Sequence, residues 1–257
     1  MQMAENMMNL LMTFLNMEFE IYPIEKEKEN KATIWEYYFA RKIAFLIAPI
    51  ILKTKTSANQ VSVLAIIIGI TAATLMALGD FWLILLGAIF MQVWLILDKT
   101  DGLIARCRKM ESPFGKFLDE LDGAIVAALF FSSIGVASST FPGFLPFSLK
   151  IPPHLFIILG ILTSFFVIFR HLVFRHFEAV FFKEKEIKSE SLFNSGRLAI
   201  FYKMAIKFLG IYSLAQPLLI LAIIFNFLGL YTMVYFIIQG GVMLANTFFL
   251  IFKASKI

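Results

Sequence analysis

Four aspartates interrupt two hydrophobic stretches in the middle of this 257-residue chain: Asp98, Asp101, Asp119 and Asp122. A carboxylate at membrane depth costs roughly 2.5 to 3.5 kcal/mol on insertion scales, so a group of four persists only if something neutralises it. A bound divalent cation is the natural candidate, because hard cations prefer oxygen ligands. These residues therefore predict a metal site, with Asp98, Asp101 and Asp119 as its main ligands and Asp122 as a fourth.

The first two acids share one face of a predicted helix with two small residues. At about 100° per residue, Asp98 and Asp101 fall on the same stripe as Gly102 and Ala105. The small residues leave room for a flat or bulky ligand to approach the backbone. This stripe thus combines metal ligands with space for a substrate.

The second pair of acids follows a basic turn, on the next predicted helix. Ser112 and Pro113 are typical of an N-cap and the first helical position. Gly115, Asp119 and Asp122 then stand at i, i+4 and i+7, again on one stripe. Exposed carboxylates paired with neighbouring basic residues would explain neither these registers nor the small residues, so we expect two facing stripes.

The composition indicates the elements that must position these stripes. The chain is 60% hydrophobic and contains 30 Phe, which is far more apolar than a soluble domain. Its single cysteine, Cys107, excludes an internal disulfide framework and a Cys-based zinc cluster, and the three His lie away from the aspartates. The net charge of +5 is interpreted as a signal of membrane topology, with no nucleic-acid partner.

Apolar runs long enough to cross a bilayer recur along the chain. The predicted fold is an all-α membrane protein with six transmembrane helices, at roughly 59–79, 81–105, 114–138, 152–176, 207–228 and 230–253. Lys and Arg concentrate in the N-terminal segment, the 106–116 turn, the 177–206 loop with its flanks, and the C-terminus. By the positive-inside rule, both termini and the predicted site face the cytoplasm.

The chain before the first span is divided into two parts. Residues 1–32 are expected to form a poorly ordered cytoplasmic segment. Residues 33–54 contain aromatic and basic residues around a short apolar run broken by Pro49, which predicts an amphipathic helix lying in the membrane interface. A solvated helix that packs on a partner is the alternative. Residues 55–257 form the predicted six-helix domain.

The two stripes together resemble the signature of the CDP-alcohol phosphatidyltransferase family. Seven fixed positions agree without a gap, in the pattern Asp98-x2-Asp101-Gly102-x2-Ala105-Arg106-x8-Gly115-x3-Asp119. The six predicted spans, the preceding interfacial helix and the Ser57 to Val61 approach to the first span extend the resemblance over most of the chain.

The resemblance implies a membrane enzyme of lipid metabolism. It would transfer a phospho-alcohol group from a CDP-linked donor to the hydroxyl of an acceptor alcohol, with release of CMP, as in phospholipid synthesis. The acids would hold Mg²⁺ or Mn²⁺, two ions in all. The donor would lie against Asp98, Gly102, Ala105, Arg106 and Gly115, although Arg106 is equally well explained as a basic anchor at the interface. Members of the family are commonly homodimers.

One position departs from the family pattern. The family places a fourth Asp four residues after the third, as a metal ligand and the usual candidate for the base that activates the acceptor. Here position 123 is Gly, and Asp122 lies one residue earlier, at about −60° from Asp119 instead of about +40°. Asp122 is the candidate base beside Asp119; the alternatives are Glu120, a metal-bound water or an inactive site.

Two further questions stay open at the level of the sequence. Arg170, Arg175 and Arg197 lie on the basic side and either hold a phosphate of the acceptor or, by the favoured interpretation, anchor the protein at the membrane. A non-catalytic homologue that binds nucleotide or lipid is the alternative function. A cation transporter is a weaker one, since both acid stripes lie near the same ends of their helices and no acidic residue continues the path.

Overall fold

The computed structural model describes residues 33–146, 150–181 and 209–255. Every regular element in these ranges is a helix. The predicted N-terminal segment, residues 1–32, and Arg197 lie outside the described residues. The all-α class is confirmed for the part of the chain that is described.

Five helices are long and apolar enough to cross a membrane, with 20 to 29 residues each. They are α4 (Ala58–Ala77), α5 (Phe81–Cys107), α6 (Pro113–Thr140), α7 (Pro153–Phe181) and α11 (Leu228–Ala254). Their bounds lie within a few residues of five of the six predicted spans. Several apolar helices of this length indicate a multi-pass membrane protein.

The predicted span at 207–228 differs from the structure. Its described part holds only α10 (Ala215–Ile224), ten residues long, preceded by a turn in which the Ser213 amide donates to the Gly210 carbonyl at 2.9 Å. Pro217 explains the interruption, because its ring would clash with the carbonyl four residues earlier in a continuous helix and is tolerated only in a first turn. Six long spans are thus not observed in the described residues.

Polar side chains set the starts of the helices. Ser57 and Gln60 form a reciprocal capping box at α4. Ser112 accepts a hydrogen bond from the Gly115 amide at 3.0 Å, with Pro113 at the first helical position of α6, which confirms the predicted boundary. These caps satisfy backbone donors that would otherwise have no partner.

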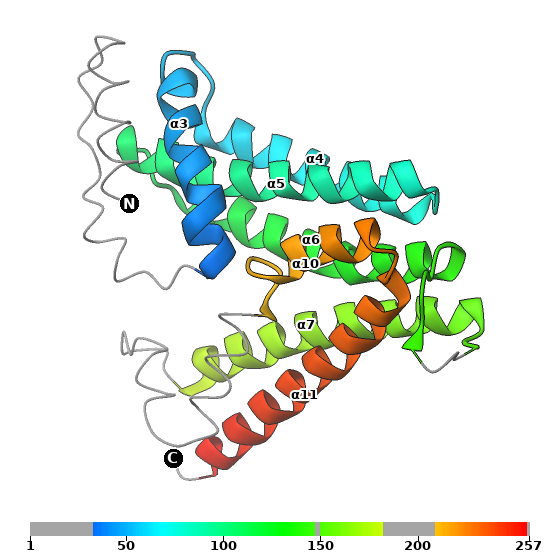
Figure 1. The fold of residues 1–257 in the computed structure, drawn as a ribbon. Coiled ribbons are helices and arrows are strands. Elements are labelled where there is room, and N and C mark those ends of the chain that lie inside the picture. The colour runs from blue at the N-terminus through cyan, green and yellow to red at the C-terminus, as the bar shows by residue number, and fades with distance from the viewer. Residues whose placement is uncertain (1–32, 147–149, 182–208, 256–257) are drawn as a thin grey trace.

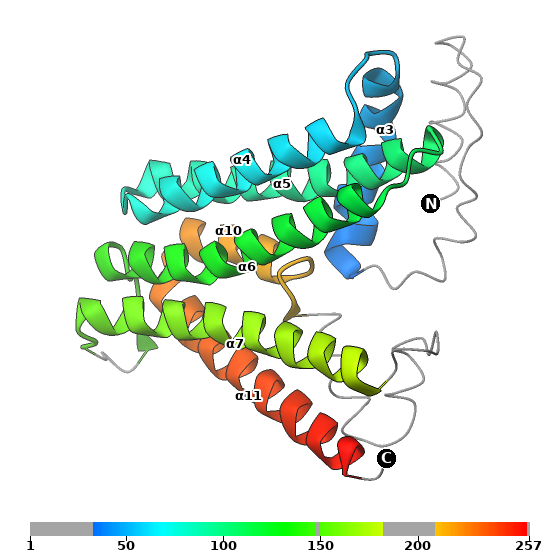
Figure 2. The same ribbon diagram turned by 180° about the vertical axis from the view of Figure 1, so that it is seen from behind.

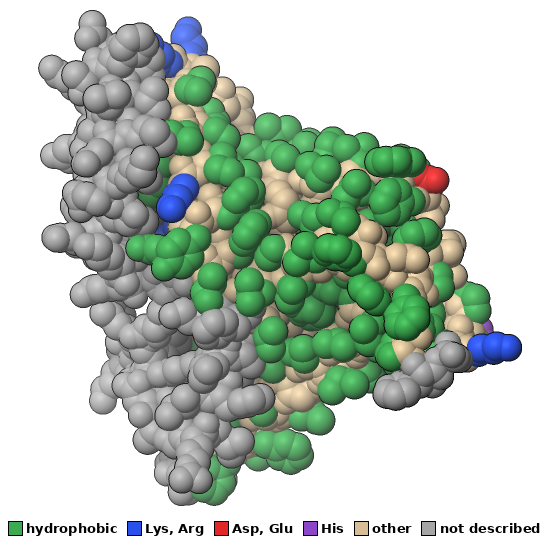
Figure 3. Space-filling model, viewed as in Figure 1, with side chains coloured by type: hydrophobic (Ala, Val, Ile, Leu, Met, Phe, Trp, Pro, Cys, Tyr) green, Lys and Arg blue, Asp and Glu red, His purple; other side chains and the backbone are tan. Residues whose placement is uncertain are grey.

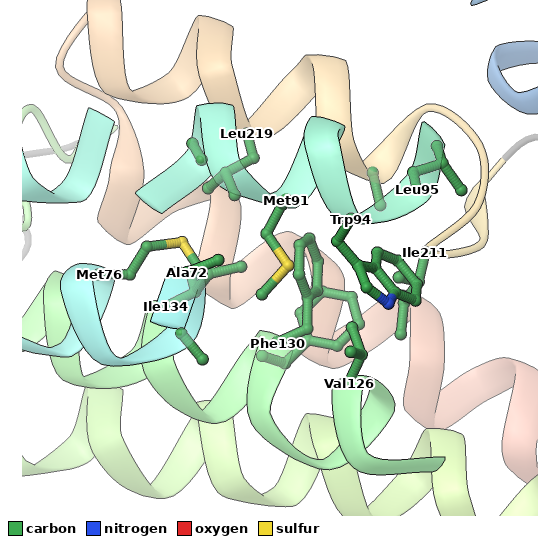
Figure 4. Close-up of a cluster of buried hydrophobic side chains, with 14 of the residues drawn as sticks. Ala72, Met76, Met91, Trp94, Leu95, Val126, Phe130, Ile134, Ile211 and Leu219 are labelled. Carbon is green, nitrogen blue, oxygen red and sulfur yellow. The ribbon is translucent and has the colours of Figure 1, made fainter. Parts of the chain in front are cut away.

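The long helices run side by side with their ends together (Figures 1 and 2). In these views α6 lies between the α4 and α5 pair and α7, while α11 crosses α7 at an angle and α10 lies against α5. The buried core includes Met91, Trp94 and Phe130, all less than 2% exposed (Figure 4). The C-terminus of α5, the N-terminus of α6 and the C-termini of α7 and α11 share one end of the bundle.

Apolar side chains also cover the outside of the bundle. Figure 3 shows them along the helix sides, with described charged side chains towards the two ends. Ile67, Ile89 and Ile237 are 54%, 46% and 70% exposed. Exposed apolar surface of this extent on long helices is typical of contact with lipid.

A helical segment precedes the first span and lies across the end of α5 (Figure 1). It consists of a π-helical turn, η1 (Glu36–Ala40), that continues into α3 (Arg41–Leu52). The α3 face that includes Ala44, Phe45 and Ala48 is buried, and α3 packs on α5 of its own chain. This packing inside the protein differs from a helix that only lies in the interface.

Arg108 fastens the loop after α3 to the end of α5. Its guanidinium donates to the carbonyls of Thr56, at 2.5 Å, and Thr54, at 2.8 Å. A planar guanidinium with several donors suits this multiple contact. The segment before the first span is therefore held firmly beside the two acid-bearing helices.

Candidate functional site

A cavity of about 710 Å³ opens where α5 ends and α6 begins. Residues from α3, α4, α5 and α6 line it. The predicted site residues among its lining are Asp98, Asp101, Gly102, Ala105, Arg106, Gly115 and Asp119. The structure thus brings together all seven positions of the signature.

The two acids of α5 are buried at the cavity wall, each 5% exposed. Asp101 accepts a hydrogen bond from the Ser62 hydroxyl of α4 at 2.5 Å and one from the Gly102 amide. Asp98 Oδ2 forms an ion pair with Lys99, whose Nζ lies 2.7 Å away. A ligand that binds this oxygen must therefore displace Lys99.

Small residues shape the α6 side of the cavity. A Cβ added at Gly115 would lie 3.2 Å from Asn59 Oδ1 and 3.3 Å from Ser112 Oγ. Both contacts are tighter than ordinary van der Waals distance, so a larger residue would crowd the cavity. Asp119 lines the cavity in the next turn of α6.

Asp122 is placed differently from the other three acids. It is 1% exposed and is not among the residues that line the cavity. Both of its carboxylate oxygens accept the Trp94 indole N–H, at 2.9 Å each. Trp94 therefore holds the side chain of the candidate base inside the bundle.

Tyr212 occupies the space beside Gly123, the position at which the family has its fourth acid. A Cβ at Gly123 would lie 2.9 Å from the Tyr212 hydroxyl. The Tyr212 ring packs against Trp94 with centroids 5.5 Å apart, and its carbonyl accepts a hydrogen bond from the Thr33 hydroxyl. A longer side chain at position 123 would have to displace Tyr212.

Three charged residues at the site lie outside the signature. Lys99 and Arg41 line the cavity, and Glu36 is buried between them, 3.6 Å from Lys99 Nζ and 2.8 Å from an Arg41 nitrogen. Burial by itself raises the pKa of Glu36, but the charges of Lys99 and Arg41 and the hydrogen bond from Arg41 outweigh it and lower the pKa below its ordinary value of 4.5. The sequence signal for this ion pair was Glu36 within an aromatic stretch, five residues before Arg41.

The side chains of the cavity suit a hard cation and an anionic ligand. Four acidic residues, Asp98, Asp101, Glu111 and Asp119, face four basic ones, Arg41, Lys99, Arg106 and Lys116. The acids offer only oxygen donors, the type preferred by Mg²⁺ and Mn²⁺. The basic residues supply the charge that a diphosphate requires.

The acids are not gathered into a cluster in the described residues, where no group of three or more acidic, His or Cys side chains lies close enough to hold an ion. Their present partners explain the spread: Lys99 holds Asp98, Ser62 holds Asp101 and Trp94 holds Asp122. The all-oxygen donor set of the lining nevertheless fits a divalent ion, which would have to displace Lys99 from Asp98.

The arginines of α7 lie away from the cavity. Arg170 donates to Gln239 Oε1 of α11 at 3.4 Å. Arg175 is paired with Glu120 of α6, so this glutamate, an alternative base by sequence, is engaged in a surface ion pair. Neither arginine lines the described cavity.

Comparison with known proteins supports the signature. A family model described as CDP-alcohol phosphatidyltransferase matches residues 55–252. A search of curated proteins found no significant match.

Proposed function

Because the chain belongs to the CDP-alcohol phosphatidyltransferase family, we propose that it transfers a phospho-alcohol group from a CDP-alcohol to the hydroxyl of an acceptor alcohol and releases CMP, in the synthesis of a membrane lipid. The family uses such donors and acceptors at the membrane and generally depends on divalent metal. The observation that carries the proposal is the cavity, in which acids from α5 and α6 lie with the small residues of the signature.

In this proposal Asp98, Asp101 and Asp119 supply the oxygen ligands for two Mg²⁺ or Mn²⁺ ions. When bound, the ions would neutralise the diphosphate and polarise the phosphorus that is attacked. Gly102, Ala105 and Gly115 leave space for the donor, as their place in the cavity lining suggests.

Basic residues complete the donor site. Arg106 and Lys116 line the same cavity and would bind the diphosphate oxygens by charge-assisted hydrogen bonds. A phosphoryl transfer requires the protein to position the donor and the acceptor more than to take part in covalent chemistry. The site would therefore act mainly by orientation and charge.

Asp122 remains the base to test first, and it would also be the fourth metal ligand of the predicted set. Its hydrogen bonds to Trp94 mean that it must turn away from the indole to receive a proton at the acceptor hydroxyl, because a base has to come within hydrogen-bonding distance. Asp122→Asn is expected to abolish turnover while nucleotide binding is retained. Turnover by this variant would assign the base to another group, such as Asp119, which lines the cavity.

We also propose that the site faces the cytoplasm. Its end of the bundle carries Arg106, Arg108, Lys109 and Lys116, whereas Lys150 lies near the start of α7 at the other end. If both ends of the chain lie on the cytoplasmic side, the chain crosses the membrane an even number of times. Because five helices in the described residues are long enough to cross, α10 with its flanking residues would then form the sixth crossing. Reaction of single cysteines, introduced at each end in a Cys107→Ser background, with an impermeant maleimide in sealed vesicles tests the orientation.

The deciding experiment measures CMP release. Purified protein is incubated with Mn²⁺ or Mg²⁺ and a panel of CDP-linked donors and acceptor alcohols, and the lipid product is identified. Asp119→Asn is expected to lose CMP release, whereas Asp80→Asn, which changes the same charge at the α5 N-cap, retains it.

The other outcomes separate the alternatives. Metal-dependent CDP binding without CMP from any pair would favour a non-catalytic homologue, and ion flux in vesicles with neither binding nor turnover would favour a transporter. Size-exclusion chromatography with light scattering tests the homodimer that the family suggests.

A further inference from the structure

Three side chains, Glu36, Lys99 and Asp98, form a chain of charges from η1 to the cavity. Lys99 Nζ lies 2.7 Å from Asp98 Oδ2 and 3.6 Å from Glu36 Oε1. Glu36 is 6% exposed, and Arg41 donates to its Oε1 through two nitrogens, at 2.8 and 3.0 Å. Lys99 thus lies between a carboxylate of the signature and a carboxylate outside it.

We infer that Lys99 is a built-in competitor of the divalent cation at Asp98, and that Glu36 is the positioning residue that draws Lys99 away when a cation binds. The inference rests on the proposed function only in taking Asp98 as a metal ligand. Lys99 and a divalent ion carry like charges and cannot share the Asp98 carboxylate without repulsion. Glu36 offers Lys99 a second partner within a short displacement.

The surroundings of Lys99 allow this displacement. Its ammonium lies 4.8 Å from the centroid of the Tyr212 ring, and an aromatic face attracts a cation without fixing it to one point. Arg41 donates two hydrogen bonds to the same Glu36 oxygen that Lys99 contacts, so this acceptor stays in place. Moving Lys99 from Asp98 to Glu36 therefore requires no rearrangement of a helix.

Other contacts fix η1, so Glu36 is not needed merely to attach this segment. Trp35 donates its indole N–H to Gln92 of α5 at 2.8 Å and stacks on Phe39 with centroids 4.6 Å apart. A buried carboxylate is costly unless its charge is used or compensated. Glu36 Oε1 is shared between Arg41 and Lys99, both of which line the cavity, so the acid is related to the cavity as well as to the segment.

Mn²⁺ binding to the purified full-length protein, followed by electron paramagnetic resonance without nucleotide, tests the inference. Glu36→Gln is expected to weaken Mn²⁺ binding about tenfold, the scale of an outer-shell change, because Lys99 then stays on Asp98. Lys99→Met removes the competitor and is expected to tighten binding. In the double variant, the effect of Glu36→Gln should vanish.

The control is Glu178→Gln, which removes the same charge from a residue of α7 that does not line the cavity; the affinity of this variant for Mn²⁺ is expected to change at most threefold. Equal affinity of Glu36→Gln and wild type, or persistence of its effect in the Lys99→Met background, would overturn the inference. If Glu36→Gln does not fold, Lys99→Met decides, since unchanged or weaker binding overturns it. Absence of Mn²⁺ binding in the wild type would instead overturn the metal site of the proposed function along with it.

Discussion

Replacing Gly123 by alanine tests how tightly Tyr212 fills the position of the family's fourth acid. The added Cβ would lie 2.9 Å from the Tyr212 hydroxyl, against 3.4 to 4 Å for an ordinary contact. The hydroxyl must therefore retreat by about 0.5 Å, and overpacking of this kind costs roughly 1 to 3 kcal/mol. Alanine in a helix recovers roughly 0.5 to 1 kcal/mol relative to glycine, so the net expectation is a destabilised protein.

The companion change is Tyr212→Phe, which removes the atom in conflict and keeps the ring against Trp94. In that background Gly123→Ala should be neutral or stabilising, which gives a coupling of about 1 to 3 kcal/mol between the two sites. At roughly 2 to 4 °C per kcal/mol for a chain of this size, the coupling corresponds to about 2 to 12 °C in Tm.

The assay uses a reporter that the chain already contains. Cys107 is the single cysteine and is buried, so a fluorogenic maleimide labels it when the detergent-solubilised protein unfolds. All variants are heated at one scan rate, because such unfolding is often irreversible.

Gly241→Ala is the matched control, since a Cβ there meets nothing within 4 Å. The reasoning is refuted if Gly123→Ala behaves like Gly241→Ala, or if its loss of Tm is the same with Phe at position 212.

Three other predictions follow from single contacts. Trp94→Phe removes both hydrogen bonds to buried Asp122 and should cost about 1 to 3 kcal/mol in thermal unfolding; an unchanged Tm would contradict it. Ser62→Ala removes a donor to Asp101 and should weaken Mn²⁺ binding about tenfold in a titration, whereas equal affinity would argue against Asp101 as a ligand. The pKa of Glu36 is lowered from 4.5, so its charge stabilises the folded protein fully above pH 4.5, and this stabilisation is lost as the pH falls through the lowered pKa. The difference in Tm between wild type and Glu36→Gln should therefore shrink on acidification, and a constant difference would contradict this.

Local sequence patterns predicted the long helices well, because each carries its own signals. Ser112 and Pro113 define the start of α6, and uniform apolar composition defines the spans. The prediction of a long span at 207–228 was not confirmed, because it relied on apolar composition and gave too little weight to Pro217. The effect of this proline on the preceding turn is steric and local. A proline in the first half of an apolar run was the signal to weigh.

The candidate site was predictable only as far as one helix face at a time. The spacing of Asp98 and Asp101 predicted that both lie on one face of α5, since the helical period places residues three apart on the same side. The partners of each acid depend on other helices: Trp94 reaches Asp122 across 28 positions of the chain, and Glu36 reaches Lys99 from the segment before the first span. Such contacts arise from the packing of whole helices, which no local pattern encodes.

The hydrogen bond from Thr33 to the Tyr212 carbonyl bears on the order in which the protein is assembled. The two residues are 179 positions apart, so at about 5 to 20 residues per second Tyr212 is synthesised roughly 10 to 40 s after Thr33. Throughout that interval η1 lacks a partner that helps to fix it beside Lys99. This contact is thus completed only when most of the chain has been made, so a nascent chain stalled before residue 212 would carry the full signature without it.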